Sequence, residues 1–337
     1  MEALSGTVED LGWIAVEEAS AAGRVRREAT TYAQNVGFSQ HRVGEVAIVA
    51  AELASNLHRH AVAGAVLLRL RREASAAAIE LVCVDAGPGV NLVDAAQDGR
   101  STRGTLGIGL GAAMRLSTFF DAHSVPGVGT VMVATLWDGD APVARPRVAG
   151  ITRPMGDEPV CGDVCAARVE RDATTLMLAD GLGHGELAAM AAREAARSFL
   201  AAPSGEPPAR TLERLNGALR PTRGAAVAVV RIDAAGTELT MAGVGNVAVW
   251  IDDGERRSGL LSTPGIVGAA TRTAREVTVP IPPHALVAMH SDGLTSKWSL
   301  DRYPGLRVRD PLLVAAVLLR DAGLRRDDAS VLIARAS

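Results

Sequence analysis

Two polar side chains, Glu52 and Asn56, stand four residues apart in the alanine-rich segment 45–57. In a helix this spacing puts them one turn apart on the same face, so they can share one ligand. An amide oxygen is a suitable ligand for Mg²⁺, which usually keeps several waters and the substrate phosphates as well. A nearby glutamate can orient or deprotonate an attacking hydroxyl. The pair therefore predicts phosphoryl transfer, with Glu52 as catalytic base and Asn56 as magnesium ligand.

Two glycine-rich segments follow in the order that a nucleotide site requires. The first comes after a predicted buried strand, 79–84, which ends in Asp85, where an adenine ring can approach the carboxylate beside a turn with little side-chain bulk. The second precedes "AAMRLSTFF", a stretch expected to be helical, so bare N–H groups and a helix N-terminus can meet phosphate oxygens. The predicted nucleotide contacts are Asn56, Asp85, Gly87, Gly89, Gly104, Thr105, Gly107, Gly109, Leu110, Gly111 and Thr130.

The single lysine decides between classes of ATP site. Lys297 is the only lysine of the chain and lies far from these glycines, which excludes a Walker A loop and an ordinary protein-kinase site. "ELASN", "DAGPG" and "GTLGIGLG" instead resemble the N, G1 and G2 boxes of the GHKL (HATPase) superfamily. Within it, "STRGTLGIGLGAAMRL" and "GVGTVMVATLW" look most like the small serine/threonine switch kinases of bacterial stress-sigma regulation. The resemblance implies a two-layer α/β sandwich that binds ATP and Mg²⁺. Taken singly, each box also fits a solvated helix face or a simple turn.

The second half carries acidic residues at the ends of apolar strands. Carboxylates in such places can converge into an all-oxygen site for Mg²⁺ or Mn²⁺, and two such ions about 4 Å apart activate a water for in-line attack on phosphorus. The expected reaction is phosphoester hydrolysis. Any one of these aspartates alone also fits a turn or a helix N-cap. The candidates are Asp163, Asp180, Asp292, Asp327 and Asp328.

"CGDVC", "LADGLGHGE", "HSDGL" and "RDDASVLIA" resemble the metal-dependent (PPM) protein phosphatases of the SpoIIE type. The resemblance implies a four-layer αββα sandwich with two Mn²⁺ or Mg²⁺ ions. It also implies that Asp180 bridges both ions and that the Gly181 carbonyl is a further ligand. The remaining metal ligands that it implies are Asp163, Asp292 and Asp327, with Asp328 as the other member of the doublet. Asn246 stands where many such phosphatases have an aspartate, which concerns a third ion and not the core pair.

Other reactive side chains keep two interpretations each. His184 is either a general acid or an incidental loop histidine, and Arg223 either reaches a phosphate or is a solvated residue beside a strand. The cysteines, Cys83, Cys161 and Cys165, are few and odd in number, which argues against a disulfide framework. Cys161 and Cys165 flank Asp163, but no further Cys or His cluster completes a zinc set.

Composition predicts a protein of two domains. Its 337 residues are 48% hydrophobic and 22% charged, enough for two cores and a wet surface. The net charge is −3 and the sequence has no block of basic residues, which argues against nucleic-acid binding. A protein partner is therefore expected. No apolar run reaches the roughly 18 residues of a membrane span, and the N-terminus is acidic and not signal-like. A cytoplasmic protein is expected.

The fold class expected is α+β, with domains 1–140 and 148–337 joined by a Pro-rich, charged linker, 141–147. In the first domain we expect a strand or short helix at the start, helices near 24–36 and over 45–57, and strands at 65–73, 77–85 and 129–137. In the second we expect helices at 186–200, 211–219 and 311–323, with successive hairpins across 225–251 and a turn at Gly236.

The two resemblances together imply opposed activities on one kind of substrate, a STAS-domain antagonist or scaffold in a sigma-factor pathway. The first hypothesis is a bifunctional switch enzyme that phosphorylates and dephosphorylates Ser or Thr of that protein, with partner or nucleotide binding favouring one domain at a time. Two alternatives stay open: a nucleotide-binding module that sequesters its partner without transfer, fused to an active phosphatase, and a phosphatase gated by ATP occupancy. A homodimer is possible for kinases of this type.

Overall fold

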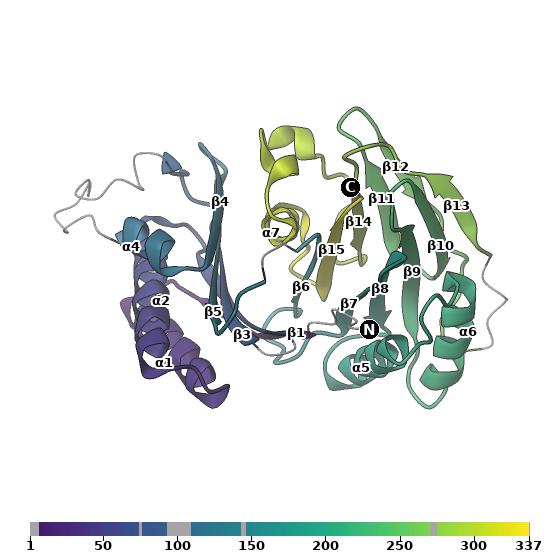
Figure 1. Ribbon diagram of the computed structural model, residues 1–337, viewed down its shortest axis with the longest axis horizontal. Coiled ribbons are helices and arrows are strands. Elements are labelled where there is room, and N and C mark those ends of the chain that lie inside the picture. The colour runs from purple at the N-terminus through teal and green to yellow at the C-terminus, as the bar shows by residue number, and fades with distance from the viewer. Residues whose placement is uncertain (1–6, 74–75, 93–108, 143–145, 270–274, 337) are drawn as a thin grey trace. The chain divides into compact units, whose positions relative to one another are not determined.

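The computed structural model describes residues 7–73, 76–92, 109–142, 146–269 and 275–336 (Figure 1). The chain divides into two compact units, with the boundary between residues 145 and 146. Among the described residues, no helix combines the length and the apolar composition that crossing a lipid bilayer requires.

The N-terminal unit is a five-stranded antiparallel sheet with helices packed on one face. The strands lie in the order β1-β2-β3-β5-β4. Their bounds are β1 Thr7–Ala15, β2 Ala65–Glu73, β3 Ala76–Val84, β4 Phe119–Val125 and β5 Gly129–Asp138, and the helices are α1 Ala19–Asn35, α2 Gln40–His60 and α4 Gly109–Leu116. This is the predicted two-layer α/β sandwich.

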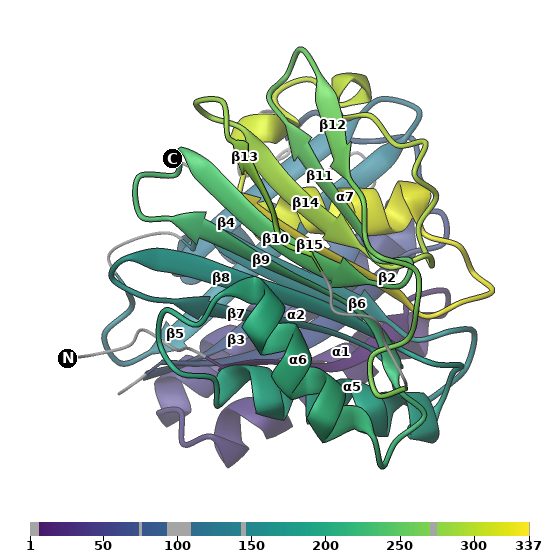
Figure 2. The same cartoon turned by 90° about the vertical axis from the view of Figure 1, so that its right-hand side faces the viewer.

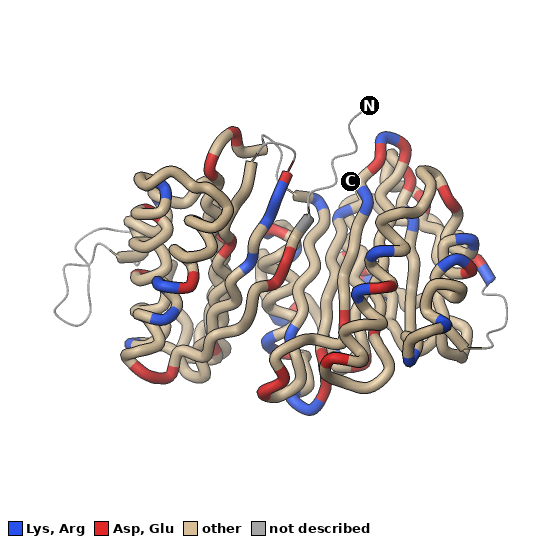
Figure 3. The backbone as a smooth tube through the Cα atoms, turned by 90° about the horizontal axis from the view of Figure 1, so that it is seen from below, with Lys and Arg blue, Asp and Glu red and all other residues tan. Residues whose placement is uncertain are grey.

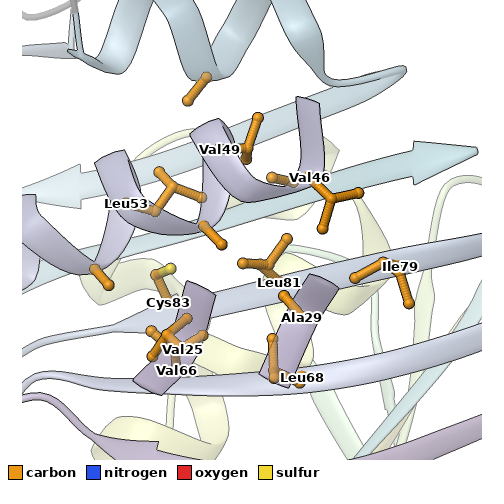
Figure 4. Close-up of a cluster of buried hydrophobic side chains, with 14 of the residues drawn as sticks. Val25, Ala29, Val46, Val49, Leu53, Val66, Leu68, Ile79, Leu81 and Cys83 are labelled. Carbon is orange, nitrogen blue, oxygen red and sulfur yellow. The ribbon is translucent and has the colours of Figure 1, made fainter. Parts of the chain in front are cut away.

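Helix α2 is held in place by its apolar stripe. Its buried residues recur at intervals of three and four, which is the period of one helix face. They pack against α1 and against the helix-facing side of the strands, as Figure 4 shows for Val49 and Leu53 above Leu81 and Leu68. The helix is capped by Ser39, the residue before its first turn, whose Oγ accepts a hydrogen bond from the Arg42 N–H at 3.3 Å. Burying this stripe leaves Glu52 and Asn56 on the partly exposed flank of the helix.

The predicted helix "AAMRLSTFF" is wrong in its second half. Helix α4 ends at Leu116, and Phe119 begins strand β4, which the sequence analysis did not predict. Phe119 lies opposite Thr135 of β5, and the Thr118 N–H donates to the Thr135 carbonyl at 2.8 Å. The open edge of β5 therefore captures this segment as a strand, and aromatic side chains suit that surface.

The C-terminal unit contains two five-stranded antiparallel sheets. The first has the order β13-β10-β9-β8-β7, and the second β12-β11-β14-β15-β6. The strand bounds are β6 Val148–Arg153, β7 Asp163–Val169, β8 Ala173–Gly181, β9 Ala225–Asp233, β10 Glu238–Val244, β11 Ala248–Asp252, β12 Arg257–Leu260, β13 Val277–Pro280, β14 Leu286–His290 and β15 Ala329–Arg335.

Three helices cover the outer faces of these sheets. The helices are α5 Glu186–Leu200, α6 Pro208–Leu219 and α7 Pro311–Ala322. One buried cluster lies between the two sheets and includes Leu178, Val230 and Met289. A second joins the first sheet to α5 and α6, which lie in front of it in Figure 2, and includes Phe199 and Leu215. Helix α7 packs on β6 and β15 of the second sheet. The result is the predicted four-layer αββα sandwich.

The expected run of hairpins across 225–251 holds only for its first part. Strands β9 and β10 pair, and Gly236 in their turn has φ +70°. Strand β11 does not pair with β10 but with β12 and β14 of the other sheet. The connection between them, which contains Asn246, therefore crosses from one sheet to the other.

Charged side chains pair locally along the helices of this unit. Arg197 of α5 lies 2.5 Å from Glu194, and Arg210 of α6 lies 2.8 Å from Glu213. Figure 3 shows basic and acidic positions interspersed along the described backbone. Pairs of this exposed kind contribute little to stability, because water and salt screen the charges.

Candidate functional site

The N-terminal unit brings Glu52 of α2 to the first residue of α4. A Cβ atom added to Gly109 would stand 2.5 Å from Glu52 Oε2. Only glycine leaves this space free, so the glutamate carboxylate can lie against the N-terminus of α4. The structure thus joins the predicted catalytic base to the predicted phosphate end of the site. Asn56 lies one turn further along the same helix, at an intermediate exposure.

Asp85 directly follows β3, and its turn lies beside the first residues of β5, the strand that pairs with β3. The Asp85 N–H donates to the Thr130 carbonyl at 3.0 Å, and its Oδ1 accepts from the Gly87 N–H at 2.7 Å. The second bond closes the small turn that aspartate favours. Thr130 is buried, with its Oγ1 3.1 Å from Ser124 Oγ, and Gly89 takes φ +77° in the same turn. Asp85, Gly87, Gly89 and Thr130 are therefore brought together.

The phosphate cradle is described only in part. Gly104, Thr105 and Gly107 lie outside the described residues. Gly109, Leu110 and Gly111 form the first turn of α4, where backbone N–H groups lack helical partners. The Leu110 side chain packs into the core, so its backbone is the part that a ligand can meet.

In the C-terminal unit, four aspartates come from strand ends of the two sheets. Asp163 opens β7 and lies directly opposite Asp180 of β8. Asp292 follows β14, and Asp327 precedes β15, which is the neighbour of β14. The Gly181 N–H donates to the Gly162 carbonyl at 3.0 Å, which fixes the backbone beside Asp180.

Burial and mutual repulsion act on these carboxyls together. Burial, followed by the charges of Asp163, Asp292 and Asp327, raises the pKa of Asp180 to about 9. Burial also raises the pKa of Asp163 to about 7, against the lowering effect of the Ser291 and Ser330 hydroxyls. The pKa of Asp327 is raised by burial and by the charge of Asp292. Carboxyls that shift one another's pKa in this way lie within electrostatic reach.

The cluster has the chemistry of a divalent-cation site. Among the residues that the structure describes, neither buried carboxylate oxygen of Asp163 has a hydrogen-bond partner, although the Ser291 and Ser330 hydroxyls lie nearby and lower its pKa. Buried carboxylate oxygens are costly unless a cation or donor meets them. Among the described residues, no three Asp, Glu, His or Cys side chains lie close enough together to bind one metal ion as they stand. The donors of the cluster are carboxylate oxygens, which are the ligands that divalent ions such as Mg²⁺ and Mn²⁺ prefer.

Asp328 has a different role from its neighbour. Its Oδ1 accepts a hydrogen bond from the Met155 N–H at 2.8 Å, and its Oδ2 accepts one from the Gly162 N–H at 2.9 Å. The side chain is 3% exposed. These bonds anchor the loop that leads to Asp163. The charges of both members act on the cluster, because that of Asp328 raises the pKa of Asp163 and that of Asp327 raises the pKa of Asp180.

Three further side chains stand at the rim of the acidic cluster. His184 Nδ1 lies 3.0 Å from Glu158 Oε1, and the charge of His184 lowers the pKa of Asp327. Asn246 Nδ2 donates to Asp292 Oδ2 at 2.5 Å. A Cβ added to Gly183 would stand 3.3 Å from Arg223 Nη1, so this guanidinium lies against the loop that carries His184.

The cysteines take no part in this arrangement. All three are free thiols. Burial raises the pKa of Cys83 to about 12 and raises that of Cys161 as well. Thiols held protonated in this way are poor nucleophiles.

Comparison with known proteins assigns the two units. Residues 170–337 match the family Stage II sporulation protein E (SpoIIE). Residues 15–138 match the histidine kinase-like ATPase domain. A solved structure from work on the bacterial stressosome, a modular system adapted to control secondary messenger signalling, is 30% identical, covering 56% of this chain and 98% of that one with a TM-score of 0.52.

The chain joins domains of two families. Its SpoIIE domain, just under half of the chain, follows a histidine kinase-like ATPase domain. That first domain is similar to the serine/threonine-protein kinase RsbT of Bacillus subtilis (strain 168), with 29% identity over 113 residues, which are 33% of this chain and 85% of the kinase. RsbX in complex with magnesium is a weaker likeness, with 20% identity, a TM-score of 0.48, and coverage of 56% of this chain and 94% of that one.

These matches confirm both predicted resemblances and the predicted class of protein, a SpoIIE-type phosphatase joined to a kinase-type ATPase domain. The sequence analysis missed Glu158 as the partner of His184, and the hydroxyls of Ser291 and Ser330 beside Asp163. Ser291 directly precedes Asp292 in "HSDGL", so the sequence could have indicated that it lies near the acidic cluster. Glu158 lies in a Pro- and Gly-containing loop and carried no such signal.

Proposed function

We propose that the chain is a bifunctional partner-switching enzyme. Domain 1–140 transfers the γ-phosphoryl group of ATP to a Ser or Thr of a STAS-domain protein, and domain 148–337 hydrolyses the phosphoester. The observation that carries the hydrolytic half is the pair of unpartnered, buried oxygens of Asp163 directly opposite Asp180. The observation that supports the kinase half is the approach of Glu52 to the N-terminus of α4.

In the kinase domain, Glu52 is the group that accepts the proton of the attacking hydroxyl through Oε2. The first-turn N–H groups of α4 receive phosphate oxygens. Asn56 supplies an amide oxygen for Mg²⁺, and Asp85 receives the adenine. Phosphoryl transfer needs mainly positioning and charge stabilisation, which this set of groups provides without a lysine.

In the SpoIIE domain, two bound Mn²⁺ or Mg²⁺ ions would supply an activated water and charge neutralisation. Asp163, Asp180, Asp292 and Asp327 would hold them, with the Gly181 carbonyl. When His184 is protonated, its Nδ1–H donates to Glu158 and its Nε2–H can give its proton to the leaving serine or threonine oxygen, which leaves a neutral imidazole. Arg223, against the same loop, adds a positive charge at the entrance for the phosphate.

A phosphate-transfer time course tests both halves. Labelled ATP, Mg²⁺ and Mn²⁺ are supplied with a panel of STAS-domain proteins from the same genome, and wild type is compared with Asp180→Asn and Glu52→Gln. Label that persists on one protein only with Asp180→Asn supports opposed activities. Glu52→Gln should abolish labelling while it leaves ATP binding within about twofold of wild type.

The non-transferring alternatives give a different result. If no protein is labelled by either wild type or Asp180→Asn, while wild type still cleaves a pre-phosphorylated STAS-domain protein, the kinase assignment is wrong. The N-terminal domain is then a binder or a nucleotide-controlled gate. If the rate of dephosphorylation by wild type then changes when ATP is bound, the result supports the ATP-gated phosphatase over the binding module.

A further inference from the structure

Arg42 connects three elements around the nucleotide site. It lies in the first turn of α2, and its side chain is only 15% exposed. Its Nε donates to the Trp137 carbonyl at 2.8 Å, its Nη1 to the Leu116 carbonyl at 2.9 Å and its Nη2 to Thr118 Oγ1 at 2.6 Å. Nη1 also forms an ion pair with Glu45 one turn along α2. One guanidinium thus uses all of its nitrogens on fixed partners.

The Leu116 contact caps the C-terminus of α4. The last carbonyls of a helix have no partner within it, and a positive charge there interacts favourably with the helix dipole. Thr118 Oγ1, which Arg42 also contacts, accepts a second hydrogen bond from the Trp137 N–H at 3.1 Å. Arg42 therefore joins the end of α4 to the end of β5 through the residues that lead into β4.

Residues of α2 therefore contact both ends of α4. Its C-terminus is bonded to Arg42, and its N-terminus lies against Glu52, ten residues further along α2. The ten residues between Arg42 and Glu52 rise about 15 Å along α2, and the eight residues of α4 span about 12 Å. These similar lengths fit an α4 that runs antiparallel to this part of α2. The Leu116 bond thus controls where the first-turn N–H groups stand relative to Glu52.

We propose that Arg42 is the positioning residue of the phosphate end of the nucleotide site. It holds α4 so that the terminal phosphate of ATP meets the first-turn N–H groups within reach of Glu52. The adenine end depends on Asp85 and Thr130. Thr130 lies at the opposite end of β5 from Trp137, about 24 Å away along the strand. Arg42 should therefore affect the terminal phosphate and leave the adenine contacts unchanged. The inference rests on the proposed ATP site.

Equilibrium binding of ATP and ADP in the presence of Mg²⁺ tests this, with the full chain and no phosphoacceptor. Arg42→Gln removes the charge and the three-way fork, and we expect about tenfold weaker ATP binding with ADP binding changed by less than twofold. Arg42→Lys, which restores one point charge but not the fork, should recover only part of the ATP affinity. Arg24→Gln, which breaks an exposed pair with Glu28 on α1, is the matched control and should change neither.

The outcomes separate the two hypotheses. Equal weakening of ATP and ADP in Arg42→Gln, or no weakening of either, overturns the role of Arg42 while the ATP site stands. A wild-type chain that binds neither nucleotide overturns the ATP site and this inference with it. If Arg42→Gln fails to fold, Thr118→Val removes one contact only and should still lower ATP affinity more than ADP affinity; an unchanged ratio in that variant rejects the proposal.

Discussion

The Asn246 side-chain amide donates a hydrogen bond to Asp292 Oδ2 across 2.5 Å. Asn246 lies on the connection that crosses from the first sheet to the second, and Asp292 follows β14 of the second sheet. The amide orients the Asp292 carboxylate without adding a negative charge to a cluster that already holds several.

Replacing Asn246 by aspartate should convert this attraction into repulsion. In the absence of metal we expect Asn246→Asp to lower the stability of the SpoIIE domain by about 1–2 kcal/mol, because a charged hydrogen bond is replaced by two like charges near solvent. Mn²⁺ should raise the melting temperature of the variant more than that of wild type. Thermal unfolding with and without Mn²⁺ measures both effects. Asn246→Ala, which removes only the donor, should show the smaller loss; equal melting of Asn246→Asp and wild type without metal would contradict the expectation.

The aspartate doublet should separate into two phenotypes. Asp327→Asn should reduce Mn²⁺ affinity and phosphatase activity at least tenfold with little change in stability, because its charge acts on the cluster. Asp328→Ala should cost about 2–3 kcal/mol, because it leaves the Met155 and Gly162 amides without their buried acceptor. Urea unfolding and metal titration of both variants are the measurements. The assignment fails if Asp328→Ala is as stable as wild type and loses only metal binding.

Two glycines of the N-terminal unit should respond oppositely to alanine. Gly109→Ala places a methyl group where Glu52 Oε2 now lies, so the carboxylate must turn away, and phosphoryl transfer should fall at least tenfold. Gly44, inside α2, has no neighbour within 4 Å of an added Cβ, and Gly44→Ala should stabilise the unit by about 0.5–1 kcal/mol. Transfer assays and chemical denaturation compare the pair. Full transfer activity in Gly109→Ala would show that the Glu52 position is not critical.

The raised pKa values of Asp163 and Asp180 predict how the metal-free SpoIIE domain responds to pH. These values, about 7 and about 9, lie above that of an unfolded aspartate, near 3.9, so the folded state binds more protons between these limits. The resulting stabilisation is complete below about pH 4 and is lost as the pH rises through 7 and 9. Urea unfolding without metal should therefore show lower stability at pH 9 than at pH 6. Mn²⁺ affinity should rise from pH 6 to pH 8, because the ligands must be deprotonated.

Asp163→Asn provides the control for this pH dependence. The variant cannot titrate at position 163, so the decrease in stability up to about pH 7 should shrink. The decrease that belongs to Asp180 should persist but end at a lower pH, because the charge of Asp163 contributes to the raised pKa of Asp180. A wild-type protein whose metal-free stability rises from pH 6 to pH 9 would reject the assignment of protonated carboxyls to the folded state.

Local patterns predicted those elements whose residues alone determine them. The apolar period of α2 placed Glu52 and Asn56 correctly on one flank, and the runs 65–73 and 186–200 match β2 and α5. Strand β4 escaped prediction because it carries Asp121 and His123 and owes its conformation to pairing with β5.

The candidate site divides in the same way. The acidic residues at strand ends were visible in the sequence, whereas their neighbours were not. Asp327 and Asp328 are adjacent and identical in type, and only the amides of Met155 and Gly162 distinguish them. The contact between Arg42 and Leu116 joins residues 74 positions apart, and no motif marks either one. Such pairs depend on tertiary structure and leave no local signature.

The late position of Asp327 in the chain has a consequence for biosynthesis. Strand β15, which it precedes, lies between β14 and β6 and supplies the last described strand of its sheet. A ribosome that has synthesised the N-terminal unit has released every residue of the ATP-type site, and domains generally fold in that order. The acidic cluster stays incomplete until Asp327 emerges and β15 pairs. A nascent or prematurely terminated chain would therefore carry the histidine kinase-like ATPase domain without a complete acidic cluster.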